Sequence, residues 1–276
     1  MMTRQMTQQE KSQFKGWFPN LDVNAAVVTG EPTQTYNCIS WTLGVTDRWL
    51  WPGASIASFD TFYRQWGFSR SGSRHIAAWG SSASSMTHGC VSGSCPRWES
   101  KCGNSLSIQH GLTELEGANY GRVSAFYNRA GIAAPFAEAF AESLSSGEQE
   151  LMKLSEQEET NLKKDISNVP EEIQIAFQDA FAAWKKTWFS GSLAIDSNPY
   201  SRSRCKEFDD LVALGQQIIP LVIETLTEDE NFFSLVLYDS IQSDSRFIVQ
   251  YEPDDLRLLQ GEQGRAIYVV KSWLAR

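Results

Sequence analysis

The stretch SMTHGCVSGSCPRWESK, residues 85–101, decides the fold of the N-terminal half. Two short runs within it, Ser85–Val91 and Arg97–Lys101, flank a segment rich in Gly, Ser and Pro, which is typical of two strands joined by a turn. If that segment is a hairpin loop, the two strands are antiparallel neighbours. A third short strand is expected just before them, at His75–Trp79. The pattern predicts a small antiparallel sheet.

Helices are expected on the N-terminal side of this sheet. One begins at about Cys38 and ends at Gly44, because glycine commonly follows the last turn of a helix. A second covers Ser58 to Trp66, with Ser58 as its cap. On the C-terminal side, Ser107–Leu115 is ambiguous, and Tyr120–Tyr127 fits either a strand or the start of a helix. Residues 1–130 therefore form a predicted mixed α and β domain.

Residues 131–276 have a different texture, rich in Glu, Ala, Leu, Gln and Lys, with apolar residues at three- and four-residue steps. We expect five or six helices and no strands there. The fold class predicted for the whole chain is α+β, with a domain at 1–130 followed by an acidic all-helical domain at 131–276. The expected helices are Phe136–Leu154, Glu171–Phe189, Cys205–Leu214, Gln216–Leu226, Asn231–Gln242 and Gln263–Leu274.

The charge of the chain, −9 overall, is unevenly distributed. Residues 1–130 hold 11 basic and 8 acidic residues, whereas residues 131–276 hold 13 basic and 25 acidic residues. An acidic half argues against nucleic acid as a partner, since a protein binds nucleic acid by neutralising its phosphates with basic residues. Its helical surface is expected to face water, and it is also where a protein partner would bind.

The chain contains neither an N-terminal apolar run of the kind found in signal peptides nor an apolar run long enough to span a bilayer. We therefore expect no membrane partner. The expected location is the cytoplasm, or outside the cell by a route that needs no N-terminal signal peptide.

A candidate nucleophile lies in QTYNCISW, residues 34–41. Cys38 stands between a turn and a predicted helix, where unpaired N–H groups and the helix dipole would stabilise a thiolate. Gln34 or the backbone N–H of Cys38 could stabilise an oxyanion, and Asn37 is a further candidate for contact with substrate.

The base that would activate this cysteine must be one of three histidines, namely His75, His88 and His110. His88 lies on a predicted strand, and the next strand carries Glu99 and Ser100. These two side chains point to opposite faces, so only one of them can orient the imidazole. We favour Glu99, because a carboxylate also stabilises an imidazolium. Ser100 and His110 remain candidates for the third position or for contact with substrate, and His75 is expected to be structural.

This order of residues resembles the papain-like cysteine hydrolases, in particular the NlpC/P60-type peptidases and amidases. The resemblance covers residues 15–130 and rests on the order of Cys38, His88 and Glu99 or Ser100. The phrases Asn37-Cys38, Thr87-His88-Gly89, Ser100-Lys101-Cys102-Gly103 and Ile108-Gln109-His110 are also similar to those of an uncharacterised bacterial and fungal domain. The Cys-Gly-Ser-Cys-Trp segment of papain itself is absent.

The resemblance implies a papain-like domain at 1–130 that hydrolyses an amide or peptide bond of a peptide or protein, without a metal or other cofactor. Cys38 would be the nucleophile, His88 the base and Glu99 the orienting residue. An exported bacterial effector or toxin is one form that such an enzyme takes. Two other functions stay open: acyl transfer of the transglutaminase or deamidase kind at the same residues, and an inactive binding module.

The other cysteines support a structural alternative. The chain has five cysteines and no evident signal peptide, which argues against a disulfide framework. His88, Cys90, Cys95 and Cys102 nevertheless supply one nitrogen and three sulfurs, a donor set that suits zinc. A disulfide between Cys90 and Cys95 is another possibility. In either case the cluster would serve structure.

Overall fold

The computed structural model describes residues 3–72, 75–93, 96–145, 153–252 and 254–276. The chain divides into two compact units. Unit 1 comprises Met1–Glu142 together with Gly191–Asn198, and unit 2 comprises Ser143–Ser190 and Pro199–Arg276. The sequence-based division at residue 130 follows chain order, whereas the structure returns a short segment of the C-terminal half to unit 1.

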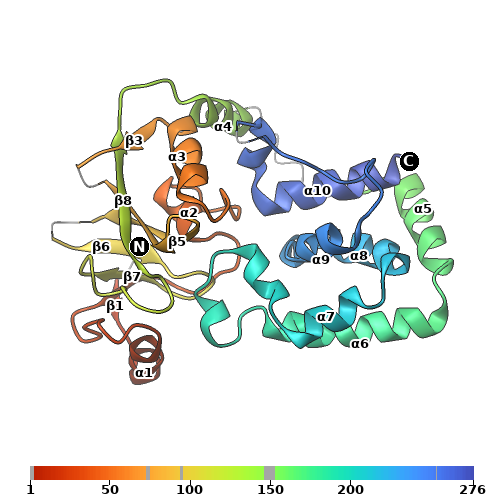
Figure 1. The fold of residues 1–276 in the computed structure, drawn as a ribbon, viewed down its shortest axis with the longest axis horizontal. Coiled ribbons are helices and arrows are strands. Elements are labelled where there is room, and N and C mark those ends of the chain that lie inside the picture. Colours follow the sequence, from red (N-terminus) through yellow and green to blue (C-terminus); the bar gives the residue numbers. More distant parts are fainter. Residues whose placement is uncertain (1–2, 73–74, 94–95, 146–152, 253) are drawn as a thin grey trace. The chain divides into compact units, whose positions relative to one another are not determined.

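Unit 1 is built on an antiparallel sheet of eight strands in the order β1-β2-β7-β6-β5-β4-β8-β3 (Figure 1). Mixed α and β structure was predicted for this half and is confirmed. The strands are β1 (Arg4–Gln5), β2 (Val27–Gly30), β3 (Phe68–Arg70), β4 (Ile76–Ser82), β5 (Ser85–Ser92), β6 (Trp98–Lys101), β7 (Ser107–His110) and β8 (Arg122–Arg129).

The central strands agree with the sequence pattern. β4, β5 and β6 coincide with the three predicted strands, and Val91 pairs with Glu99 in the expected antiparallel arrangement. The two ambiguous segments prove to be β7 and β8. The outer strands β1, β2 and β3 were not predicted, because each has only two to four residues and shows too little alternation.

Three helices belong wholly to unit 1: α1 (Gln8–Trp17), α2 (Cys38–Thr42) and α3 (Ile56–Gln65). Figure 1 shows α2 and α3 on the same side of the sheet. α2 has only five residues, and α3 begins earlier than predicted because Ser55, rather than Ser58, caps it. Gly89 of β5 lets α2 approach closely, since a Cβ there would lie 3.2 Å from Thr42 and 3.3 Å from Ile39.

The opposite face of the sheet carries a hydrophobic core that α1 covers. Phe14 of α1 and Phe18, which follows the last residue of that helix, belong to the same buried cluster as Trp79 and Trp98 of the sheet. Ile195, from the segment that returns to unit 1, is part of this cluster as well. The core is therefore completed by a residue that lies far along the chain.

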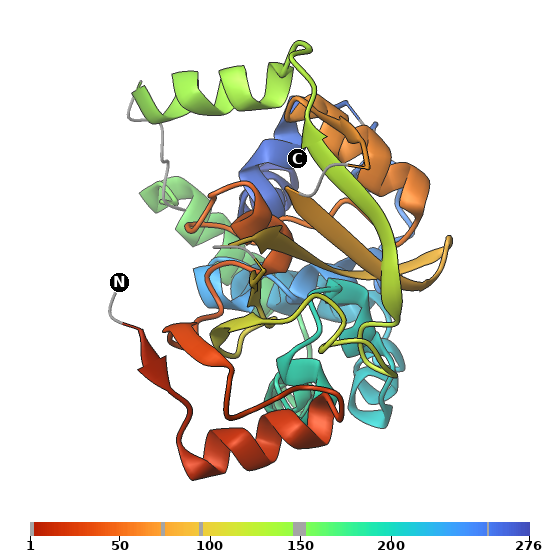
Figure 2. The ribbon, with the colours of Figure 1, turned by 90° about the vertical axis from the view of Figure 1, so that its left-hand side faces the viewer.

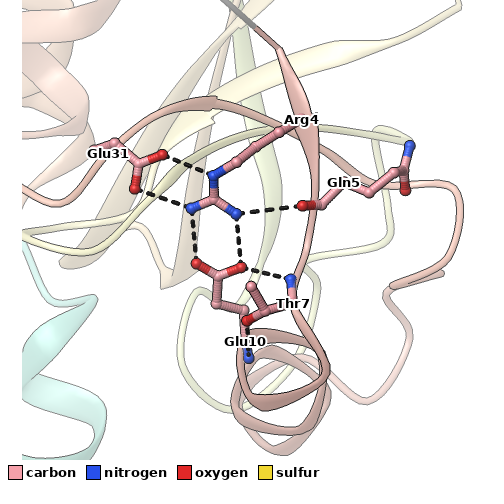
Figure 3. A network of polar contacts seen from close by, with 5 residues as sticks. All are labelled: Arg4, Gln5, Thr7, Glu10 and Glu31. Carbon is pink, nitrogen blue, oxygen red and sulfur yellow. Dashed lines mark hydrogen bonds and ion pairs between the residues drawn. The ribbon is translucent and has the colours of Figure 1, made fainter.

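The N-terminus is held by a network of charges, shown in Figure 3. The Arg4 guanidinium on β1 forms a two-bond ion pair with Glu10 of α1 and another with Glu31, just after β2. Glu10 also accepts the N–H of Thr7, which caps α1. Figure 2 shows how β1 leads directly into α1. The network thus ties the first strand to the first helix.

Unit 2 is helical. Trp184 and Trp188 of α6 pack edge to face, and the Trp184 indole donates to the carbonyl of Arg202, whose guanidinium lies over the ring of Phe233. The helices of the C-terminal half, including α4, which runs from unit 1 into unit 2, are α4 (Pro135–Ser145), α5 (Glu156–Ser167), α6 (Glu171–Thr187), α7 (Lys206–Val212), α8 (Ile219–Thr225), α9 (Ser234–Ile241) and α10 (Gly261–Leu274).

Most of these helices fall where the sequence periodicity predicts them. Five or six helices were expected, and the described residues of this half contain seven. The predicted helix Phe136–Leu154 extends too far, because α4 ends at Ser145 and α5 begins at Glu156. Short 3-10 turns join the helices: η1 (Gly191–Ala194), η2 (Pro199–Ser203), η3 (Gln216–Ile218), η4 (Asp229–Asn231) and η5 (Leu256–Gln260). Within the described parts of the chain, no helix is both long enough and apolar enough to cross a bilayer.

Candidate active site around Cys38

Cys38 is the first residue of α2 and is completely buried. Asn37 places it, because the Asn37 side chain caps the helix by accepting the N–H of Ser40 and donates to the carbonyl of Leu50. Both ends of that amide are used within the protein. The structure therefore assigns Asn37 a positioning role in place of the expected contact with substrate.

The Cys38 thiol has two polar neighbours. It donates to the hydroxyl of Ser197 across 3.1 Å, and the Gly89 N–H hydrogen-bonds its sulfur. Burial nevertheless dominates and raises the pKa of the Cys38 thiol to about 11. The predicted thiolate at the start of a helix is wrong for this conformation, because a short buried helix does not compensate for the loss of water around the charge.

A chain of hydrogen bonds crosses three strands beside Cys38. The Ser100 hydroxyl lies 2.9 Å from Nε2 of His88 and 2.7 Å from Nε2 of His110. Nδ1 of His110 lies 2.7 Å from the carbonyl oxygen of Gly111. All three side chains are fully buried. β5, β6 and β7 each supply one member of this chain.

The direction of each hydrogen bond follows from its partner. A carbonyl oxygen only accepts, so His110 carries its proton on Nδ1, and its Nε2 accepts from Ser100. The single Ser100 proton is then used, so Ser100 accepts from Nε2–H of His88. A neutral His88 therefore has a bare lone pair on Nδ1. That atom is buried and has no hydrogen-bond partner among the described residues.

The environment keeps both imidazoles neutral. Burial is the main reason that the pKa of His110 falls to about 4, and it also places the pKa of His88 well below the usual value, with the nearby His110 adding to the effect. The ring of Tyr120 stacks on His88 with centroids 3.9 Å apart, and Trp79 meets it edge-on. His88 is thus a neutral, rigidly held base.

No hydrogen bond joins Cys38 to His88 among the described residues. The N–H that contacts the Cys38 sulfur belongs to Gly89, the residue next to His88. In the described part of the chain the His88 Nδ1 accepts no hydrogen bond, from Cys38 or from any other group. The thiol instead donates to Ser197. The structure buries both predicted residues and links them through the backbone of Gly89, without forming the pair.

Two other predicted roles need correction. Glu99 does not orient His88, because it lies on the opposite face of β6 from Ser100, and Ser100 makes the contact. The alternation of the strand was recognised, but the wrong face was chosen. Gln34 is partly buried, and the hydrogen bonds of the described residues include none to its side chain, so nothing places it as an oxyanion donor.

Lys101 is a buried residue that the sequence analysis did not single out. Its ammonium donates to the carbonyls of Gly103 and Ser105 and to that of Thr33, at 2.6–3.2 Å. Burial lowers the pKa of Lys101 to about 7. These bonds fold the loop after β6 against the segment that precedes α2. The only sequence signal for Lys101 was its position next to Ser100 on a predicted strand.

The proposed metal cluster does not form among the described residues. Cys90 and Cys102 are buried free thiols, and no group of three or more metal-binding side chains occurs in the described ranges. Cys95, needed for both the zinc and the disulfide alternatives, lies outside the described residues.

Comparison with known proteins adds a domain but no activity. Residues 27–128 match the model of a domain of unknown function, DUF7689. Searches of curated proteins and of solved structures returned no match. Cys38, His88, Ser100 and His110 therefore lie within the matched residues. Ser197, whose hydroxyl accepts the thiol hydrogen bond, lies outside them.

Proposed function

We propose that unit 1 is a cysteine-nucleophile hydrolase with a papain-like arrangement, acting on an amide bond of a peptide or protein. One observation supports this above the others: the hydrogen-bond chain leaves a bare, unpartnered nitrogen on the buried His88, the neighbour in sequence of the Gly89 whose N–H contacts the Cys38 sulfur. An unpaired buried acceptor is costly, and a structural histidine would normally have a partner there.

In the proposed reaction, Nδ1 of His88 takes the thiol proton while the Cys38 sulfur bonds to the carbonyl carbon of the substrate. Collapse of the tetrahedral intermediate breaks the C–N bond, and the imidazolium returns the proton to the leaving amine. Water, deprotonated by His88, then hydrolyses the thioester and restores the thiol. Ser100 and His110 hold the His88 ring and fix its tautomer, the role first given to Glu99.

The test is the rate at which iodoacetamide alkylates Cys38 between pH 5 and pH 9 in the native protein and in His88→Ala. Trypsin releases residues 16–48, a peptide with Cys38 as its sole cysteine, so mass spectrometry follows this thiol alone. We expect the rate at pH 7 to fall at least tenfold in His88→Ala, within the usual range for loss of a general base. An unchanged pH profile would refute the proposal.

A non-catalytic binding module is the second candidate, and complete burial of Cys38 with a raised pKa favours it. In that case the polar chain would serve only to specify the packing of the sheet. Cys38 would then react only on unfolding, at the same denaturant concentration at which tryptophan fluorescence reports loss of structure.

A further inference from the structure

Residues 191–198, called the strap from here on, cover the candidate site although they come from the C-terminal half of the chain. The Ser197 hydroxyl accepts the hydrogen bond of the Cys38 thiol, and Ser197 is fully buried. The carbonyl of Ser197 accepts the indole N–H of Trp49 across 2.9 Å. A group of the strap thus binds the thiol hydrogen that the proposed reaction transfers to His88.

The rest of the strap is held by backbone hydrogen bonds and by the side chain of Ile195, which is buried in the core of unit 1. The Tyr120 hydroxyl donates to the carbonyl of Ile195, and the Asn104 N–H donates to that of Ala194, both across 2.9 Å. Tyr120 is also the ring that stacks on His88. The same side chain therefore contacts the proposed base and holds the strap.

The loop after β6 is shaped to accept the strap. Gly103 has φ +53°, and a Cβ there would lie 2.5 Å from the carbonyl carbon of Ile195 and 2.7 Å from the carbonyl oxygen of Ala194. Only glycine permits this approach. Backbone carbonyls held at three positions and a glycine at the crossing show that unit 1 binds the backbone of the turn that follows η1.

We propose that the strap is an autoinhibitory segment that occupies the substrate position, and that Cys38 becomes reactive when residues 191–198 move away from α2 and from the loop after β6. The proposal rests on the proposed hydrolase function. It assigns the substrate as a peptide that adopts the same turn, so that its backbone carbonyls replace those of Ala194, Ile195 and Ser197, with a small side chain at the Ser197 position. Release of the strap admits water to the thiol and removes its hydrogen bond to Ser197.

The main experiment compares Gly103→Ala with Gly131→Ala in the full-length protein. Both glycines have positive φ, but a Cβ at Gly131 meets no atom within 4 Å, so this variant reproduces the backbone strain without the clash. We expect iodoacetamide at pH 7 to modify Cys38 at least tenfold faster in Gly103→Ala and at the native rate in Gly131→Ala. Hydrogen exchange of residues 191–198 should accelerate in parallel.

A second pair of variants covers the case in which Gly103→Ala does not fold. Trp49→Phe with Tyr120→Phe removes two donors to the strap and keeps an aromatic ring at each position. Trp66→Phe with Tyr127→Phe removes the same atoms elsewhere in unit 1. There the Trp66 indole N–H has no hydrogen-bond partner among the described residues, and the Tyr127 hydroxyl donates to Asp60. We expect about tenfold faster alkylation of Cys38 in the first pair alone, as for two lost neutral hydrogen bonds.

The outcomes separate this proposal from the function on which it rests. If iodoacetamide modifies Cys38 no faster in either strap variant than in the native protein, the strap does not limit access to the thiol. If a strap variant reacts faster and adding His88→Ala leaves that rate unchanged, the strap covers the thiol but the hydrolase proposal fails. If a strap variant reacts faster and adding His88→Ala abolishes that increase, the result supports both the autoinhibitory strap and the hydrolase function.

Discussion

Unit 1 contains two polar networks that differ in their exposure to water. The Arg4–Glu10–Glu31 network lies at the surface, and all three groups are charged (Figure 3). The His88–Ser100–His110 chain is fully buried, and each group in it is neutral. Burial therefore decides the protonation state. The exposed network contributes a small stabilisation, whereas the buried one holds two neutral imidazoles.

The largest effect is expected where the buried network is broken. Ser100→Ala leaves Nε2–H of His88 and Nε2 of His110 without partners, which should lower the free energy of unfolding by about 4 kcal/mol. Urea unfolding followed by tryptophan fluorescence measures this.

Thr29→Val is the matched control for the buried serine, since the Thr29 hydroxyl is buried and no described group bonds it. The free energy of unfolding should hardly change in this variant. An equal effect of the two substitutions would show that the chain between the histidines carries no special stabilisation.

The two networks should lose their contributions to stability in different ranges of pH. The folded-state pKa of His110, about 4, lies below its unfolded value of about 6.5, so the unfolded chain binds a proton first. The full stability is present above pH 6.5 and is lost progressively as the pH falls towards 4, by about 3 kcal/mol for this group. His88 adds a loss of the same sign.

The measurement is the free energy of unfolding in urea at steps between pH 7 and pH 5. His110→Gln should flatten this dependence even though its absolute stability is lower. His75→Gln, which removes an exposed histidine, should leave the dependence intact. A native protein whose stability is constant across this range would contradict the neutral assignment.

The surface network should give the smallest effect, in a lower pH window. Arg4 hydrogen bonds lower the pKa of Glu10 to about 2, so the contribution of the pair is complete above pH 4.3 and disappears as the pH falls towards 2. Because water screens the pair, we expect Arg4→Gln to cost about 1 kcal/mol at pH 7.

Salt provides the check on that value. At 1 M NaCl the difference between the native protein and Arg4→Gln should shrink by at least half. Lys163→Gln, which removes an exposed ion pair with Glu159 within a single helix, should have a smaller effect at low salt. A difference unaffected by salt would mean that Arg4 acts through packing.

The sequence was sufficient for the features that depend on neighbouring residues. Turn residues between two short runs located the hairpin from β5 to β6, and apolar spacing located α6. Cys38 and His88 were recognised as candidates from residue type and order. Strand alternation placed Glu99 and Ser100 on opposite faces but could not show which face His88 shares.

Contacts between distant segments were beyond such reasoning. Ser197 lies 159 residues from Cys38, and its neighbours Asp196 and Asn198 suggest only a turn. Nothing local shows that Gly103 must be a glycine because Ile195 crosses it. The raised pKa of Cys38 could not be predicted either. It results from burial, and the segment of residues 191–198 that contacts the thiol lies far from Cys38 in the sequence.

The discontinuity of unit 1 has a consequence for biosynthesis. At the usual rates of translation, the strap follows residue 142 by roughly 3–10 s. During that interval the sheet and α2 have emerged while the place of Ile195 in the core is vacant. The nascent chain thus passes through a stage in which the thiol is uncovered, and arrival of the strap closes the core and masks Cys38 in a single step.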